Sequence, residues 1–393
     1  MNILHYRKYL IYLLSVLIIV NCVGSAFAGT KGSIRVSGSY PEPNGKAAVL
    51  MDAASGRVLY SKNMNNRLPQ ASLTKIMTAM LVVENGDLDQ NVQASEHAVK
   101  TGESTIYLQV GETLTVRELL YACMLPSAND ASTALAETIA GSDNSFVELM
   151  NQRAIQLGMA DTHFCNPHGL ETAGHYTSAY DLALLTRQAM TYPIFRQVVA
   201  TKRMSLPWAG RNEPRIILNE NRLLYRYKGA IGVKTGYTKK AGNCVVGAAR
   251  KGDLELIAVA LNSSTVYEDL QQMLDYGFTH YEMVNLQNAD QISAQVTVLS
   301  GKVKKVTAIP ASDLLVAVKP QEKDKLSYKV VPKSKVTAPL KIGDDLGACI
   351  IYLNDKEVRR VNLIAAFEVP VQKHFWSSIF DNIKLLFSKV TLM

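Results

Sequence analysis

The stretch Ala71-Ser-Leu-Thr-Lys-Ile-Met-Thr-Ala-Met80 places a serine and a lysine three residues apart at the start of a predicted helix. Apolar residues continue at helical spacing as far as Glu84, so we expect a helix over residues 71–84. Side chains three residues apart lie on one face of a helix, which lets Ser72 and Lys75 contact each other. A serine hydroxyl is a poor nucleophile until a neighbour takes its proton, and a lysine with a lowered pKa can do so. The stretch therefore predicts a nucleophile with its own base.

A second short motif, Ser127-Ala-Asn129, carries polar groups suited to a substrate cleft. It follows Pro126 in the loop between helices that we expect over residues 116–124 and 129–139. Loops held by a rigid scaffold commonly present such groups to a binding site. We therefore expect Ser127 and Asn129 to point into a cleft.

A third motif, Lys234-Thr-Gly236, comes directly before an apolar strand. Gly236 lets a substrate backbone approach closely, and Lys234 with Thr235 can hold a terminal carboxylate. In the plainer alternative, Ser72 and Asn129 only cap helices and the lysines are solvated. Each motif alone is weak, but their order and their placement on the expected elements favour the catalytic interpretation.

The remaining pattern predicts an α/β domain over about residues 40–283, because strands occur at both ends with helices between them. From residue 286 to 369 the chain changes to short Val/Ile-rich runs, which predict a small β domain. In the α/β domain we expect strands at 47–51, 57–60, 244–250 and 254–261, with further helices at 145–157, 179–190 and 266–283. In the β domain we expect strands at 296–299, 314–318, 327–331, 348–353 and 358–365.

The N-terminus has the pattern of a secretory signal peptide. Basic Arg7 and Lys8 precede an apolar run from Leu10 to Val20, and Ala26-Phe-Ala28 has the small-x-small pattern of a cleavage site. We expect cleavage after Ala28 and an exported protein. An uncleaved membrane anchor is the alternative, although the run is short for a full span. Lipoprotein processing at Cys22 is disfavoured, because Asn21 is not the small residue that it prefers.

The C-terminus, residues 374–393, predicts an amphipathic helix in a membrane interface. Phe375, Trp376, Ile379 and Phe380 begin an apolar series at three- and four-residue steps, and lysines are interleaved on the other side. Such a helix lies in a membrane interface, and for an exported protein we expect it to bind the outer face of the cytoplasmic membrane. The alternative is a helix that packs on the β domain or on a partner. We thus expect four segments: a signal peptide at 1–28, a catalytic domain at 29–283, a β domain at 284–373 and this helix.

Composition excludes several classes of protein. Of 393 residues 48% are hydrophobic and 19% are charged, which is ordinary for a globular protein. The net charge of +8 suits an anionic cell envelope, but no dense Lys/Arg run indicates nucleic acid. The histidines and cysteines lack metal-ligand spacing, so we expect no metal and no cofactor. We expect four cysteines to be buried free thiols: Cys123, Cys165, Cys244 and Cys349. In an exported protein, one or two disulfides among them are the alternative.

In these motifs the chain resembles the D-alanyl-D-alanine carboxypeptidase family of low-molecular-mass penicillin-binding proteins, whose Ser-x-x-Lys, Ser-x-Asn and Lys-Thr-Gly elements are shared with class A β-lactamases. The longer stretches Asn166-Pro-His-Gly-Leu170, Tyr180-Asp-Leu-Ala183 and residues 232–243 also carry the resemblance. It covers nearly all of the chain after the signal peptide. One departure is Gln70, where proline often stands; here Pro69 lies one place earlier.

The resemblance implies a serine β-lactamase/DD-peptidase-like fold, with an antiparallel sheet and a helical cluster, followed by the β domain and the C-terminal helix. It also implies the chemistry. Ser72 attacks the carbonyl between the two terminal D-alanines of a peptidoglycan stem peptide, and Lys75 accepts its proton. D-Alanine leaves, and water then hydrolyses the acyl-enzyme. Ser127 relays protons, while Asn129 binds the substrate amide and steadies Lys75.

The same resemblance implies a substrate-binding strand. Lys234 and Thr235 hold the terminal carboxylate, Gly236 permits close approach, and the N–H groups of Ser72 and Tyr237 form the oxyanion hole. The partners implied are peptidoglycan stem peptides, β-lactams as covalent inhibitors and the membrane surface.

Three other functions remain as alternatives. A β-lactamase would need a glutamate that activates water, and Glu171 lies in a different context, Gly169-Leu-Glu-Thr-Ala. Endopeptidase or transpeptidase action on crosslinked peptidoglycan is not separable by sequence. A non-catalytic wall-binding protein is disfavoured by the intact motifs. His175, Ser178 and Asp181 also suggest a triad, which we interpret as loop and helix-cap residues.

Overall fold

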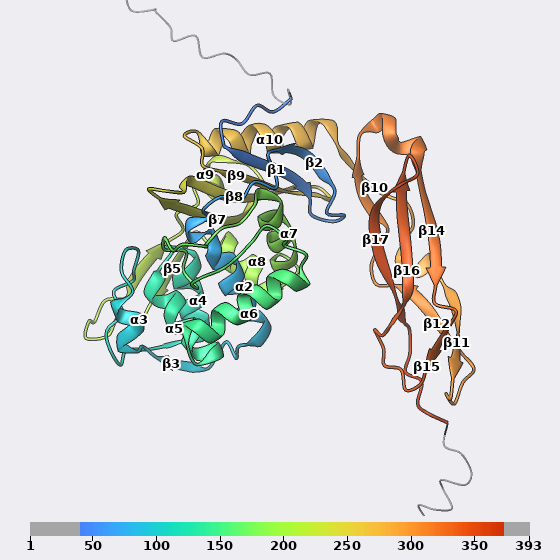
Figure 1. The fold of residues 1–393 in the computed structure, drawn as a ribbon, viewed down its shortest axis with the longest axis horizontal. Helices are drawn as coiled ribbons and strands as arrows, with labels where there is room; N and C mark the ends of the chain where they lie inside the picture. Colours follow the sequence, from blue (N-terminus) through green and yellow to red (C-terminus); the bar gives the residue numbers. More distant parts are fainter. Residues whose placement is uncertain (1–39, 373–393) are drawn as a thin grey trace, which may run out of the picture.

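The computed structural model describes residues 40–372, which form an α/β part and a β part (Figure 1). The α/β part is built on one five-stranded sheet whose neighbouring strands are all antiparallel. Its strand order is β2-β1-β9-β8-β7, with β1 Ala47–Asp52, β2 Val58–Lys62, β7 Ala230–Thr238, β8 Gly242–Lys251 and β9 Leu254–Leu261. The first and the last strands of the predicted domain pair from Ala47↔Leu261 to Asp52↔Leu256. The predicted antiparallel α/β architecture is confirmed.

Both faces of this sheet are covered, which explains why β1 is apolar throughout. Its side chains alternate between the two faces. Ala48 and Leu50 pack with helix α10 (Val266–His280), whereas Val49 and Met51 pack with the helical cluster on the other side. Figure 1 shows α10 on one side of the sheet and the cluster on the other.

The helical cluster surrounds one buried helix, α2, which begins at Lys75 and directly follows the turn that carries Ser72. The predicted helix is present, but its first turn is a 3₁₀ helix, η1, over Ala71–Thr74. Every residue of α2 from Lys75 to Val82 is buried. The bounds are α2 Lys75–Asn85, α3 Glu96–Lys100, α4 Val116–Met124, α5 Asn129–Ala140, α6 Asp143–Gln156, α7 Ala179–Ala189, α8 Pro193–Ala200 and α9 Leu223–Arg226. The helices predicted here agree with α4, α5, α6 and α7 to within about two residues at their ends, and α3, α8 and α9 were not predicted.

Two small hairpin-like sheets flank the cluster and were also not predicted. One pairs β3 (Asn91–Gln93) with β4 (Thr113–Thr115), and the other pairs β5 (Arg203–Leu206) with β6 (Arg215–Leu218). Long polar connections separate the paired segments, so no short turn signal marks them in the sequence.

The β part contains the five expected strands and three more. Its six-stranded sheet has the order β14-β16-β17-β12-β11-β15, and β10 pairs separately with β13. The bounds are β10 Glu282–Asn285, β11 Ala294–Leu299, β12 Lys305–Pro310, β13 Leu315–Val318, β14 Leu326–Pro332, β15 Lys335–Thr337, β16 Asp345–Leu353 and β17 Lys356–Ala365. The described chain ends at the tip of this part that lies far from α10 (Figure 1).

Polar contacts join the two parts where β1 and β2 meet the β13 region. The Arg57 guanidinium donates to both carboxylate oxygens of Glu322, at 3.0 Å each, and to the carbonyl oxygen of Ala317 at 2.8 Å. The N–H of Ala317 in turn donates to the buried carboxylate of Asp52 at 3.2 Å. The orientation of the β part is therefore fixed by several directional bonds.

The predicted signal peptide, residues 1–28, and the predicted C-terminal helix, residues 374–393, lie outside the described residues. Within residues 40–372, no helix combines the length and the apolar character that a membrane span requires.

Candidate active site

The Ser72 side chain lies at the junction between the central helix and the sheet. It belongs to η1, so it does not cap an α-helix, and Ala71 before it has a left-handed backbone with φ of 48°. A side chain at Gly169 would place its Cβ 2.0 Å from the carbonyl oxygen of Ala71. The turn that presents Ser72 is thus held against a closely packed loop, which only glycine permits.

Lys75 is fully buried, and three oxygen atoms surround its amino group. Its Nζ lies 3.1 Å from Ser72 Oγ, 2.6 Å from Asn129 Oδ1 and 2.7 Å from the carbonyl oxygen of His168. Burial, and then the positive charge of Lys234, lower the pKa of Lys75 to about 7. A neutral amine has two hydrogens and one lone pair. Because the amide oxygen and the carbonyl oxygen accept hydrogens, the lone pair is left for the Ser72 hydroxyl.

Asn129 is the first residue of α5, and its side chain is not a helix cap. The N-cap is Ala128, which makes no side-chain bond. Asn129 accepts from Lys75 and donates from Nδ2 to the carbonyl oxygen of Gly102 at 2.8 Å, while its N–H donates to Ser104 at 2.7 Å. The alternative that Asn129 serves only as a cap is therefore wrong.

Ser127 lies beside Ser72 on the wall of one cavity. Its backbone is left-handed, with φ of 63°, and the residue is 3% exposed. Its Oγ has no hydrogen-bond partner among the described residues. An unpaired buried hydroxyl is costly, and strained backbones cluster at ligand sites. The residue lines the same cavity as Ser72, and no hydrogen bond joins its hydroxyl to Lys75.

The Lys-Thr-Gly motif lies on β7, which is an edge strand of the five-stranded sheet. Lys234 is buried, and burial lowers its pKa to about 8. A Cβ at Gly236 would lie 3.0 Å from the backbone nitrogen of Ser72. The third motif therefore approaches the nucleophile through a position where an added side chain would be crowded, and Tyr237, which follows it, is exposed.

The three motifs converge on a cavity of about 310 Å³. This size is suited to a small ligand. It is lined by Ser72, Glu103, Ser104, Ser127, Glu220, Thr235, Gly236, Tyr237, Asn243, Cys244, Val245, Val266 and Tyr267. Lys75 and Lys234 adjoin the cavity through Ser72 and Thr235 rather than lining it.

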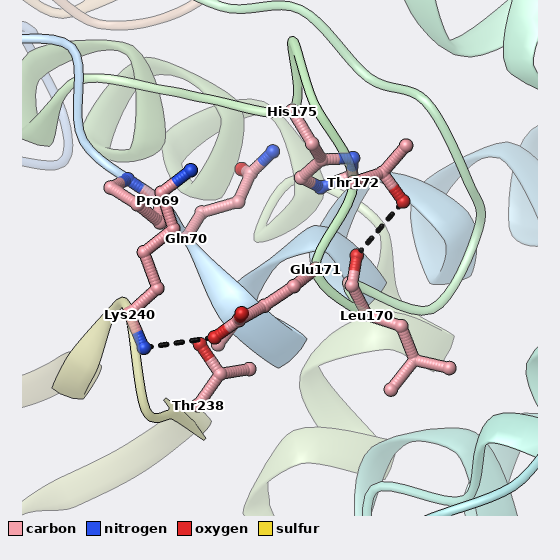
Figure 2. Close-up of a pocket in the computed structure, with 10 residues that line it drawn as sticks. Pro69, Gln70, Leu170, Glu171, Thr172, His175, Thr238 and Lys240 are labelled. Carbon is pink, nitrogen blue, oxygen red and sulfur yellow. Dashed lines mark hydrogen bonds between the residues drawn. The ribbon is translucent and has the colours of Figure 1, made fainter.

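The loop between α6 and α7 contacts Lys75 and Thr74, and these contacts could not be predicted from the sequence. It supplies the carbonyl oxygen of His168 to Lys75, and His175 Nε2 lies 2.7 Å from Thr74 Oγ1. Figure 2 shows a neighbouring small pocket where Glu171 meets Lys240, whose N–H donates to Glu171 Oε1 at 2.8 Å. Backbone carbonyls and cross-loop bonds of this kind carry no sequence signal.

The suggested Ser178–His175–Asp181 triad does not form. Ser178 caps α7 by accepting from the N–H of Asp181. The Asp181 carboxylate accepts from Thr162 Oγ1 at 2.7 Å and from the N–H of Asp161 at 2.8 Å, so it does not contact His175. The interpretation of these residues as loop and cap residues is confirmed.

The described cysteines are all free. Cys123, Cys244 and Cys349 are buried as expected, but Cys165 is partly exposed, because it lies in the loop between α6 and α7. No group of three His, Cys, Asp or Glu side chains within residues 40–372 is arranged to hold a metal ion.

A serine lies beside a buried lysine, between the helical cluster and an edge strand that carries Lys-Thr-Gly. This arrangement defines a serine acyl-transfer enzyme. The family comparisons specify it further. Residues 35–265 match the D-alanyl-D-alanine carboxypeptidase family model, and residues 281–371 match the C-terminal domain of penicillin-binding protein 5. The chain belongs to the D-alanyl-D-alanine carboxypeptidase family, and the predicted family, fold and enzyme class are confirmed.

Individual relatives agree with this assignment. The chain is 37% identical over 332 residues to D-alanyl-D-alanine carboxypeptidase DacF of Bacillus subtilis, covering 82% of this chain and 85% of the relative. It is 30% identical over 378 residues to DacC of Escherichia coli, covering 92% and 93%. Penicillin-binding protein 5 from Haemophilus influenzae superposes with a TM-score of 0.66 at 27% identity, covering 84% of this chain and 99% of that one. The protein is accordingly a serine-type carboxypeptidase of peptidoglycan stem peptides that binds β-lactams.

Proposed function

We propose that Ser72 is the acylated residue and that Lys75 is its base. The observation that carries this assignment is the set of three contacts around Lys75 Nζ, which directs a lone pair at Ser72 Oγ. Ser72 Oγ attacks the carbonyl carbon between the two terminal D-alanines, and its proton passes to Lys75. The pKa of about 7 lets the amine accept that proton near neutral pH.

The tetrahedral oxyanion is stabilised by the backbone N–H groups of Ser72 and Tyr237. The N–H groups at a helix start lack intrahelical partners, which leaves that of Ser72 free for this role. The close approach of Gly236 to the Ser72 nitrogen supports it, because it brings β7 next to the start of the helix. Lys234 and Thr235 hold the terminal carboxylate beside the same strand.

Collapse of this intermediate breaks the peptide C–N bond. Ser127 passes its proton to the leaving amine and is reprotonated by Lys75, which becomes neutral again. D-Alanine departs and leaves the shortened peptide esterified to Ser72. The unpaired hydroxyl of Ser127 on the cavity wall supports this relay. Water then attacks the ester while Lys75 again takes a proton, and Ser72 regains its own. Asn129 binds the substrate amide and keeps Lys75 oriented.

The protein acts outside the cytoplasmic membrane, tethered at its surface. Three features support this: the signal-peptide pattern of residues 1–28, the amphipathic pattern of residues 374–393, and the end of the described chain at the far tip of the β part. The catalytic domain spans residues 29–283 and the β domain residues 284–373. Deleting residues 374–393 is expected to release the protein from membranes and to leave its activity on a soluble peptide intact; loss of both would contradict the tether.

The decisive experiment uses purified residues 29–393, diacetyl-Lys-D-Ala-D-Ala and mass spectrometry. Wild type is expected to release one D-alanine, and Ser72→Ala is expected to release none. Labelled penicillin should add covalently to Ser72 in the wild type alone. Adduct formation without release of D-alanine would indicate that the enzyme acts on crosslinked peptidoglycan. Rapid turnover of the β-lactam would favour the β-lactamase alternative.

A further inference from the structure

The end of the β part that lies far from α10 is built from three segments of the chain (Figure 1). They are the turn that joins β11 to β12, the loop before β16 and the stretch after β17, namely residues 299–305, 338–344 and 366–372. The N–H of Gln372 donates to the carbonyl oxygen of Ser300 at 2.7 Å. Leu340 and Val369 exchange two backbone hydrogen bonds of 2.9 Å. We call these three bonded segments the tip.

The tip exposes a group of large apolar side chains. Five of them are each at least 40% exposed: Leu299, Val303, Ile342, Phe367 and Val371. The hydrophobic core of the β part takes Leu340 and Val369 from the same segments and leaves these five outside it. Single exposed apolar residues are ordinary on a protein surface, but a group of them in one place marks an interaction surface.

Lysines lie beside these residues in the chain: Lys302, Lys304, Lys305 and Lys341. All four are exposed, and none of their ammonium groups has an ion-pair partner among residues 40–372. The tip has two acidic residues, Asp344 and Glu368, and the Asp344 carboxylate accepts from the N–H of Lys341 at 2.8 Å. The tip therefore carries a net positive charge next to its apolar residues.

A bilayer with anionic headgroups matches both properties. Apolar side chains are stabilised when they leave water for the membrane interface, and lysines near an anionic lipid surface are attracted to it. A lysine also keeps its ammonium group among the headgroups while its stem lies along apolar surface. A soluble polyanion would pair with the lysines but leave the apolar side chains in water. The combination therefore favours lipid as the partner.

The position of the tip in the chain indicates the same partner. The described chain ends at the tip, with Gln372, so the amphipathic sequence of residues 374–393 begins beside it. Docking of that segment on the tip is the alternative cover for the apolar residues. Charge opposes this docking, because the segment has Lys384 and Lys389 against Asp381 alone, and like charges repel. An anionic bilayer attracts the segment and the tip alike.

We propose that the tip is a membrane-binding site of its own, which contacts anionic lipid beside the proposed C-terminal helix. This inference rests on the proposed tether, because the tether brings the tip to the bilayer. A helix alone leaves the β part free to tilt about its attachment, whereas a second contact sets the orientation of the β part on the bilayer. The tip thus orients the enzyme as well as retaining it.

The first test measures binding of residues 29–393 to phosphatidylcholine vesicles with and without phosphatidylglycerol. Lys302→Gln with Lys341→Gln should weaken binding to the anionic vesicles by about fivefold for each charge removed, and should have little effect on the neutral ones. The matched control, Lys325→Gln with Lys356→Gln, removes two exposed lysines at the other end of the β part, where β14 and β17 begin. The control should bind both kinds of vesicle as wild type does.

The apolar side chains of the tip are tested in the same assay. Val303→Ser with Ile342→Ser should weaken binding to both kinds of vesicle, because burial of apolar surface does not depend on headgroup charge. Release of D-alanine from a soluble peptide should be unchanged in all of these variants, since none of the substituted residues lines the active-site cavity. A variant that fails to release D-alanine is thereby recognised as misfolded and is left out of the comparison.

Hydrogen exchange of residues 29–393 locates the contact. Anionic vesicles should slow exchange at residues 299–305 and 338–344 and leave the turn at 354–356 unchanged. Binding with unaltered exchange at the tip, and with equal affinities for the tip variants and the control, would overturn the tip site alone. Absence of binding to any vesicle would overturn the proposed tether as well. Faster exchange at the tip after deletion of residues 374–393, without vesicles, would show that this segment covers the tip and would overturn the proposal.

Discussion

His175 Nε2 and Thr74 Oγ1 lie 2.7 Å apart, and Thr74 is two residues along the chain from Ser72. His175 Nδ1 accepts from the N–H of Cys165, so the proton is on Nε2 and is donated to Thr74. The Thr74 hydroxyl donates in turn to the carbonyl oxygen of Ala71 at 2.9 Å. A neutral histidine in a single tautomer thus holds the strained residue that precedes Ser72.

Removing the hydroxyl of Thr74 is expected to damage both stability and catalysis. Thr74→Val leaves the Nε2–H of His175 buried without a partner, which costs about 1–3 kcal/mol of unfolding free energy. The turn at Ala71 also loses its tether, so acylation of Ser72 should slow. Denaturant unfolding and the rate of labelled-penicillin acylation measure the two effects. Thr74→Ser keeps the hydroxyl and serves as the control; a valine variant with wild-type acylation would contradict this role.

The stability of the fold should fall in acid. Burial lowers the pKa of His175 to about 4, while in the unfolded chain the imidazole titrates near its ordinary value of about 6.5. Between these values the unfolded state binds the proton and the folded state does not, so stability is complete above about pH 6.5 and decreases down to about pH 4. The loss from this residue is about 3 kcal/mol. Tm measured across this range should be flatter in His175→Asn than in wild type.

The rate of D-alanine release should follow a bell-shaped dependence on pH. Lys75, with a pKa of about 7, must be neutral to accept a proton, so kcat/KM rises through that value. Lys234, with a pKa of about 8, must be charged to hold the terminal carboxylate, so kcat/KM falls above it. Lys234→Arg should move the alkaline limb upward, because arginine keeps its charge. A profile that stays flat from pH 6 to 9 would count against both assignments.

Gly236→Ala should block the approach of β7 to the nucleophile. The new Cβ would lie 3.0 Å from the Ser72 nitrogen, a backbone atom that cannot move aside cheaply. We expect acylation by penicillin to drop at least about tenfold, since misplacement of reacting groups is costly. Gly102→Ala is the control, because its Cβ would meet nothing within 4 Å. Equal losses in both variants would indicate a general effect of alanine and not a local clash.

The contact between Ser72 and Lys75 could be predicted because both side chains belong to one short local motif. Ser72 and Lys75 are one helical turn apart, so their contact follows from helix geometry alone. The carbonyl oxygen of His168 could not be predicted, because every residue carries such an oxygen and only the tertiary fold selects one. Glu103 on the cavity wall was missed for a similar reason. Its backbone is left-handed, with φ of 65°, and its neighbours Gly102 and Ser104 are bonded by Asn129, which lies 26 positions further along the chain.

The strands also divide into those that the local sequence predicts and those that it does not. Strands β8 and β9 were predicted because a short Lys251-Gly-Asp253 turn joins two apolar runs. Strand β12, Lys305–Pro310, was missed because it ends in proline, which argues against a strand interior. The pairing of β5 with β6 depends on packing against the helical cluster, which the local pattern does not reveal.

The bonds of Arg57 and Asp52 across the junction have a mechanical consequence. They set the angle between the sheet that carries Lys234 and the β part, which extends from it as an arm. When the far tip of that arm is tethered at a bilayer, as proposed, the cavity stays at one height above the lipid. Such an enzyme trims stem peptides within a single layer of the wall and leaves those beyond its reach untouched.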